Sequence, residues 1–248
     1  MDHSYLYSTR IEKSFDEDQA EILDIINHEL AICSSLNVRL INYYKGLPIS
    51  YPARIVAVEK GILDLDVLPH QLFTMLESRY TFIRSKALKH DVYATVQYAN
   101  IKRRAVSLRK LCYVEILAEQ RDYLRLDLDK QQNAMLFTNE GVIQGKLTEL
   151  AINGACVKIE HPCSLEMDSE MTLSFMLHNR HQNLDYNVKT NARLVGIEGT
   201  SYPKYFRFFI TPDKVLDRLL AQYLFQRQIE IIREIKDASE VYLNGGMA

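Results

Sequence analysis

The sequence predicts a mainly β protein, built as two small antiparallel β-barrels in series with an α-helix near each end. Short runs that alternate apolar and polar residues are separated by turn signals such as Lys60-Gly61 and Asn139-Glu140-Gly141, a pattern typical of antiparallel sheets. Long segments with apolar residues at helical spacing lie near the ends, at about 16–33 and about 212–235. With 248 residues, the chain is long enough to bury a core in each of two domains.

The first predicted domain comprises residues 1–118. Ser14 and Glu17 are spaced as a capping box, which predicts the start of the first helix. After this helix, apolar and polar residues alternate as in β-strands, except in a short helix that we expect after Pro69. We expect strands at 38–44, 53–59, 62–67, 80–84, 92–99, 104–108 and 111–117.

The second predicted domain comprises residues 119–248, and Ala118–Gln120 is the predicted linker, because strand patterning ends there. The linker is not rich in Pro, Gly or Ser, so we expect the domains to be close. Thr211 as N-cap and Pro212 as the first helical residue predict the start of the last helix. We expect strands at 134–138, 142–149, 154–160, 171–177, 186–197 and 204–210.

The charge balance argues against a general nucleic-acid binder, because the net charge is −2. One basic run, Lys102-Arg103-Arg104 with Arg109-Lys110, could still touch nucleic acid, although such runs are more often a solvated strand face. A nucleic-acid-binding barrel that uses this run therefore stays open as an alternative, weaker than the two functions described below. A salt-dependent gel shift with RNA or DNA would reveal it.

Metal binding, disulfides and membrane insertion are not indicated either. The four cysteines have no C-x-x-C spacing, which favours free thiols in a reducing cytoplasm. His178 and His181 fall in a predicted exposed loop without a third ligand at a definable spacing. No stretch approaches the roughly 20 apolar residues that span a bilayer, and the N-terminus lacks the apolar run of a signal peptide. We therefore expect a cytoplasmic protein.

Two sequence motifs follow the linker. Arg121 and Arg125 form R-x-x-x-R, and some two dozen residues later comes Glu149-Leu150-Ala151-Ile152-Asn153-Gly154. This order resembles the PilZ family, small β-barrels that bind cyclic di-GMP and carry R-x-x-x-R followed by [D/N]-x-S-x-x-G. The first motif is matched in full. In the second, Glu149 stands for Asp or Asn, Ala151 stands for Ser, and Gly154 is the glycine.

The resemblance implies a PilZ barrel for the second domain. The layout of the first is similar to the split barrel of two-domain flagellar-brake-type PilZ proteins, which changes its orientation when the second domain binds nucleotide. The resemblance to the PilZ family also implies a non-enzymatic effector that has no cofactor and whose ligand is cyclic di-GMP. It further implies an unidentified protein partner in the control of motility, biofilm or surface polysaccharide. PilZ domains take the ligand as a monomer or as an intercalated dimer, so homo-oligomer formation stays open.

The arginines have the right chemistry for this ligand. A guanidinium can fork onto a phosphate or onto the O6/N7 edge of guanine, and it can stack on the base. Arg121 and Arg125 could therefore clamp a compact dianion, whereas the plain alternative is a pair of solvated surface arginines. Gln120, beside the first motif, and Asn153, inside the second, are further candidate ligand contacts.

The second motif leaves the function open. Glu149 can accept hydrogen bonds from N1–H and N2–H of guanine, or it can be a solvent-facing strand residue. Gly154 would permit a positive φ or a close approach of the ligand, or it can be a plain hairpin glycine. Ala151 cannot make the serine contact, a loss on the order of 1 kcal/mol. This loss favours the main alternative, a divergent PilZ protein that binds no nucleotide and serves as a structural or adaptor module.

Overall fold

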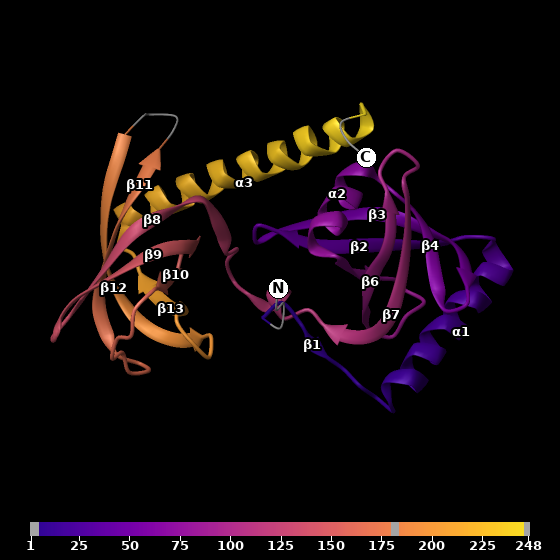
Figure 1. Ribbon diagram of the computed structural model, residues 1–248, viewed down its shortest axis with the longest axis horizontal. Coiled ribbons are helices and arrows are strands. Elements are labelled where there is room, and N and C mark those ends of the chain that lie inside the picture. The colour runs from indigo at the N-terminus through magenta and orange to yellow at the C-terminus, as the bar shows by residue number, and fades with distance from the viewer. Residues whose placement is uncertain (1–4, 180–183, 246–248) are drawn as a thin grey trace. The chain divides into compact units, whose positions relative to one another are not determined.

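The computed structural model describes residues 5–179 and 184–245, and it divides the chain into two compact units, each containing one β-barrel (Figure 1). The first unit consists of the described residues of Met1–Tyr44, Pro48–Arg121 and Ile232–Ala248. The second consists of Lys45–Leu47 and Asp122–Ile231. The predicted mainly β fold with two antiparallel barrels and terminal helices is confirmed.

The barrel of the first unit is one curved sheet, in the order β1-β7-β4-β3-β2-β5-β6, and the pairing of β6 with β7 closes it. Its strands are β1 (Ser8–Thr9), β2 (Leu36–Tyr44), β3 (Leu47–Glu59), β4 (Ile62–Val67), β5 (Tyr80–Arg84), β6 (Asp91–Asn100) and β7 (Ala105–Glu115). Its helices are α1 (Phe15–Cys33) and α2 (Pro69–Ser78). The alternation read from the sequence is observed directly in β4, where Leu63, Leu65 and Val67 are buried.

The first helix begins as its capping residues predict. The Ser14 hydroxyl accepts from the Glu17 backbone N–H at 3.3 Å and donates to the Glu17 carboxylate at 2.7 Å. Ile22 and Ile26, one helical turn apart, are fully buried and attach the helix to the barrel.

Two features of the first unit differ from the sequence prediction. The expected strands 104–108 and 111–117 are a single strand, β7, because Lys110 takes a left-handed conformation (φ 55°) that shifts the alternation without ending the pairing. The predicted linker is ordered as a 3₁₀ helix, η1 (Leu117–Gln120). Arg84 holds it through hydrogen bonds of 3.2 and 2.7 Å to the Glu119 carboxylate. The position of the domain boundary stays a prediction.

The second unit contains a closed barrel in the strand order β10-β13-β12-β11-β8-β9. Its strands are β8 (Leu126–Thr138), β9 (Gly141–Ala151), β10 (Gly154–Ile159), β11 (Glu170–Asn179), β12 (Leu184–Glu198) and β13 (Lys204–Thr211). β8 begins eight residues before the expected residue 134, because its pairing with β9 is irregular between Asp127 and Gln132, which hides the alternation in the sequence.

The last helix, α3 (Lys214–Leu243), differs from the prediction at both ends. Asp213, not Thr211, caps it, since the Asp213 carboxylate accepts from the backbone N–H groups of Val215 (2.9 Å) and Leu216 (2.8 Å). The helix also continues past residue 235. In this last part, which belongs to the first unit, Ser239 is fully buried and its hydroxyl lies 2.8 Å from Nδ1 of His70 in α2.

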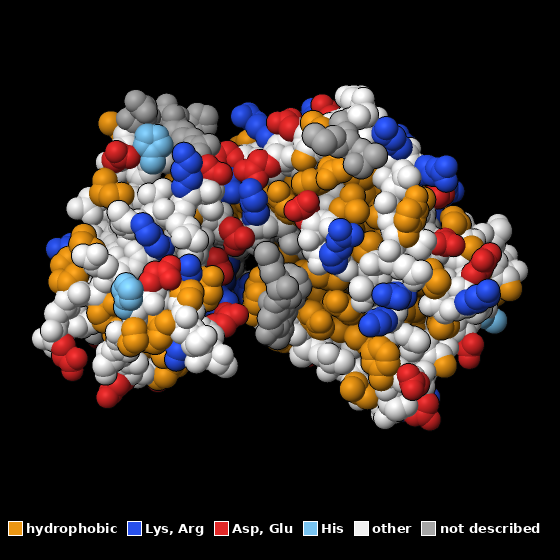
Figure 2. All heavy atoms as spheres, viewed as in Figure 1, with side chains coloured by type: hydrophobic (Ala, Val, Ile, Leu, Met, Phe, Trp, Pro, Cys, Tyr) orange, Lys and Arg blue, Asp and Glu red, His pale blue; other side chains and the backbone are white. Residues whose placement is uncertain are grey.

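Within residues 5–179 and 184–245, no helix is long and apolar enough to cross a membrane, and no three His, Cys, Asp or Glu side chains are grouped as a metal site. His178 lies in β11, not in a loop, and its Nδ1 is 2.8 Å from the Asp185 carboxylate across the β11–β12 pair. His181 lies outside the described residues. On the face in Figure 2, Lys and Arg side chains are interspersed with Asp and Glu.

Candidate ligand cavity on the second barrel

A cavity of about 260 Å³ lies on the outer face of the second barrel. Along β13, Phe206, Phe208 and Ile210 are buried inside the barrel, so Arg207 and Phe209 between them point outward. The cavity is lined by Arg125, Glu149, Leu150, Ala151, Asn153, Gly154, Ala155, Cys156, Arg193, Val195, Arg207, Phe208 and Phe209.

Strand register brings the polar groups of this cavity together. Cys156 in β10 is directly opposite Glu149 in β9 on one side and Arg207 in β13 on the other. The side chains of Glu149 and Arg207 reach across Cys156, with Oε2 and Nη1 3.4 Å apart. Arg207 also donates from Nη2 to Glu198 at 2.7 Å, so two carboxylates fix its guanidinium. Burial opposes the Arg207 charge, but these carboxylates outweigh it and raise its pKa.

Two further arginines line the same cavity. Burial lowers the pKa of Arg125, and the like charge of Arg207 lowers it further. The negative charge of Glu149 partly offsets both effects. Arg193 lies over the ring of Phe209, with 5.9 Å from Cζ to the ring centroid, and pairs with Asp168 at 2.9 Å. Three arginines and one glutamate among the lining residues give the cavity a formal charge of +2, which suits a compact dianion.

A buried acid adjoins this cluster. Asp127 in β8 is directly opposite Glu149 in β9. Burial, and then the negative charge of Glu149, raise the pKa of Asp127 from its ordinary value near 3.8 to about 6. The charge beside the cavity therefore changes within a mildly acidic range of pH.

Five of the seven candidate residues from the sequence line this one cavity: Arg125, Glu149, Ala151, Asn153 and Gly154. Glu149 is not a solvent-facing residue, because its side chain is only 23% exposed and is paired with Arg207. Gly154 does not have the positive φ considered for it, since the turn is formed by Ile152 and Asn153 and Gly154 is the first residue of β10. The close approach of a ligand to Gly154 stays a prediction.

The other two candidates, Arg121 and Gln120, are not among the residues that line the cavity. Both belong to the first unit. Arg121 donates from Nη2 to the backbone carbonyl of Tyr5 at 2.9 Å, and Gln120 donates to the Glu115 carboxylate at 2.8 Å. Their contact with a ligand stays a prediction.

Sequence reasoning missed Arg193, Arg207 and Phe209. They lie in β12 and β13, far along the chain from both motifs, and only the closed sheet brings them to the β9–β10 hairpin. The available signal was weak: in the β13 sequence Lys204-Tyr-Phe-Arg-Phe-Phe-Ile-Thr211, Arg207 is the one charged residue between inward-facing phenylalanines.

The fold and the cavity thus define a class: a two-barrel β protein with a basic cavity on its second barrel. No protein-family model matches the chain, and no curated protein matches its sequence. Among solved structures, the chain is similar to YcgR and to the PilZ domain of YcgR.

Three of these structures indicate the extent of the likeness. Escherichia coli YcgR in complex with c-di-GMP is 12% identical, with 96% of this chain and 99% of that chain covered and a TM-score of 0.43. The Bacillus subtilis inhibitor of motility, MotI/DgrA, is 14% identical, with 79% of this chain and 97% of that chain covered and a TM-score of 0.42. The YcgR PilZ domain with c-di-GMP is 15% identical, with 48% and 98% covered and a TM-score of 0.38. At these TM-scores the likeness transfers no ligand or partner, and the architecture rests on the strand pairing itself.

Proposed function

We propose that this protein is a cytoplasmic, non-enzymatic effector that binds cyclic di-GMP in the cavity of its second barrel and thereby regulates a partner protein in motility or biofilm formation. The observation that carries the proposal is the convergence of Arg125, Arg193 and Arg207 on one cavity that also contains Glu149. Cyclic di-GMP carries two phosphates that the arginines can bind and guanine edges from which Glu149 can accept hydrogen bonds.

Each group has a role in this proposal. The guanidinium of Arg125 forks onto a phosphate or onto the O6/N7 edge of a guanine, and its burial strengthens that contact. Glu149 accepts from N1–H and N2–H of the base. Arg207 keeps its second partner, Glu198 (2.7 Å), when Glu149 turns to the ligand. Phe209 and Arg193 offer a stacking surface beside the phosphates.

The signal itself would be a shift of population. Arg121 belongs to the first unit and Arg125 to the second, and a ligand held by both arginines favours whichever arrangement of the domains brings them together. Such a shift requires different affinities for the two arrangements. Small-angle scattering with and without cyclic di-GMP measures it, and identical curves at saturating ligand contradict the switch.

Isothermal titration calorimetry with cyclic di-GMP tests the binding. Arg125→Ala should lower the affinity at least about tenfold, because a charge-assisted fork is worth roughly 1.5–3 kcal/mol. Arg103→Ala, in the exposed turn between β6 and β7, is the matched control and should change nothing. Cyclic di-AMP is the ligand control, since adenine lacks the N1–H and N2–H donors from which Glu149 would accept hydrogen bonds.

One residue favours the second candidate function, a nucleotide-free adaptor. Ala151 lines the cavity but has no polar group and is only 1% exposed, so the hydroxyl of the PilZ motif has no substitute at this position. The decisive result is the absence of heat when the wild-type protein is titrated with about 100 μM cyclic di-GMP, a concentration well above the Kd that specific ligand sites usually reach. In that case the adaptor replaces the effector as the proposed function.

A further inference from the structure

The N-terminal segment Tyr5–Thr9 is bound along the first barrel. Leu6 is 3% exposed and belongs to the apolar core, and its carbonyl accepts from the Ala118 backbone N–H at 3.0 Å. The two residues of β1 pair antiparallel with Val114 and Glu115 of β7. The segment is therefore an added edge strand with a buried anchor.

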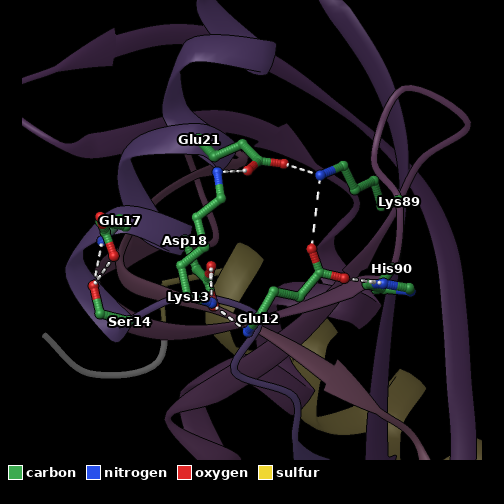
Figure 3. A network of polar contacts seen from close by, with 8 residues as sticks. All are labelled: Glu12, Lys13, Ser14, Glu17, Asp18, Glu21, Lys89 and His90. Atoms are coloured by element: carbon green, nitrogen blue, oxygen red, sulfur yellow. Dashed lines mark hydrogen bonds and ion pairs between the residues drawn. The ribbon is translucent and has the colours of Figure 1, made fainter.

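Contacts on either side of β1 hold this segment in place. The Tyr7 ring stacks on Tyr93, with 5.0 Å between centroids. Farther along, Glu12 lies 2.9 Å from Nε2 of His90 and 3.7 Å from Nζ of Lys89, and its backbone N–H donates to Asp18 at 2.8 Å (Figure 3). Attachment at both sides keeps Tyr5 at a high effective concentration beside its neighbours.

The neighbour of interest is Arg121, the first arginine of R-x-x-x-R. Its Nη2 donates to the Tyr5 carbonyl at 2.9 Å, and its Cζ lies 5.9 Å from the centroid of the Tyr5 ring. A carbonyl oxygen and an aromatic face are the kinds of partner that a phosphate oxygen and a guanine base would offer to the same guanidinium.

We propose that Tyr5 is a built-in competitor that occupies Arg121 in the free protein and must release it before cyclic di-GMP can use it. This inference rests on the proposed function. Only molecules in which Tyr5 has released Arg121 can bind cyclic di-GMP through this arginine. The apparent affinity is therefore the intrinsic affinity multiplied by the fraction of such molecules. The N-terminal segment thus sets the nucleotide concentration at which the protein responds.

Substitutions at Tyr5 in the full chain test the proposal by calorimetry with cyclic di-GMP. Tyr5→Ala should raise the affinity about two- to fivefold, the worth of an exposed cation–π contact. Tyr5→Phe keeps the ring and should leave the affinity unchanged, whereas Tyr5→Trp should lower it. Tyr98→Ala, which removes a tyrosine 50% exposed on β6, is the matched control and should have no effect.

A double mutant identifies the partner of Tyr5. On an Arg121→Ala background, Tyr5→Ala should no longer raise the affinity. An affinity that is unchanged or lower in Tyr5→Ala, while thermal unfolding matches the wild type, overturns the competition and leaves the proposed function intact. An absence of heat from the wild type and from every Tyr5 variant overturns both.

Discussion

Glu149 and Arg207 form an ion pair across the outer face of the second barrel, with 3.4 Å between Oε2 and Nη1 and with Cys156 on the strand between them. Both side chains are mostly buried, at 23% and 19% exposure. In the free protein each satisfies the charge of the other, and a ligand that binds Glu149 must replace an existing partner.

Glu149→Ala should weaken cyclic di-GMP binding more than Glu149→Asp. Alanine removes both acceptors for the guanine edge, a loss of about tenfold or more, while aspartate keeps them with a shorter reach. Calorimetry on both variants measures the difference. Equal losses of affinity in the two variants would mean that the Glu149 carboxylate does not accept hydrogen bonds from the guanine base. Thermal unfolding is the control, because Glu198 still pairs with Arg207 in both variants.

Gly154→Ala should lower the affinity for cyclic di-GMP and leave the stability of the protein nearly unchanged. A Cβ here would lie 3.6 Å from the Phe208 carbonyl and 3.9 Å from the Ala151 Cβ, which is ordinary contact, so the free energy of unfolding should change by less than about 0.5 kcal/mol. The methyl group would instead project beside the ligand and should lower the affinity at least about fivefold. Unaltered affinity at unaltered stability would contradict a ligand at this position.

Gly145→Ala is the matched contrast on the same hairpin. Its Cβ would meet Val157 Cγ1 at 2.5 Å and the Lys158 carbonyl at 2.8 Å. Overpacking of this kind costs about 1–3 kcal/mol, so urea unfolding should report a loss of that size. A variant as stable as Gly154→Ala would show that the strands move apart at little cost.

Ala151→Ser should raise the affinity for cyclic di-GMP by up to about tenfold, because it restores the hydroxyl of the PilZ motif at a position that lines the cavity. Calorimetry beside the wild type measures the gain. Ala151→Val, which adds volume without a donor, is the control and should not improve binding. If serine and valine act alike, the missing hydroxyl is not the reason for weak binding.

Asp127→Asn should change how stability depends on pH. The pKa of Asp127 is raised from about 3.8 to about 6, so between these values the folded protein holds a proton that the unfolded chain has lost. The free energy of unfolding of the wild type therefore falls as pH rises from about 4 to about 6 and stays lower above that range. Asparagine cannot ionise, so the variant should be the more stable one at pH 7, by on the order of 2–3 kcal/mol, and similar near pH 4.

Urea unfolding at several pH values measures this difference. Asp24→Asn, on the exposed side of α1, is the control and should follow the wild type. A constant offset between Asp127→Asn and the wild type from pH 4 to pH 7 would mean that Asp127 titrates normally.

The sequence predicted the strands best where the alternation was uninterrupted, as in β4 and β13. It failed where the backbone shifts the alternation, at Lys110 in β7 and at the start of β8. The cavity residues of β9 and β10 were predictable because a single hairpin contains them. Arg193 and Arg207 were not, since their approach to Glu149 depends on how a six-stranded barrel closes.

The two-residue turn of Ile152 and Asn153 has a consequence for engineering. It fixes Gly154 opposite Ala151, and through this register Cys156 opposite Glu149. Inserting one residue into the turn would slip β10 along β9 and direct alternate side chains to the opposite face. The length of this turn therefore determines which side chains of β10 face the cavity, and we expect a one-residue insertion to abolish cyclic di-GMP binding although no cavity residue is substituted.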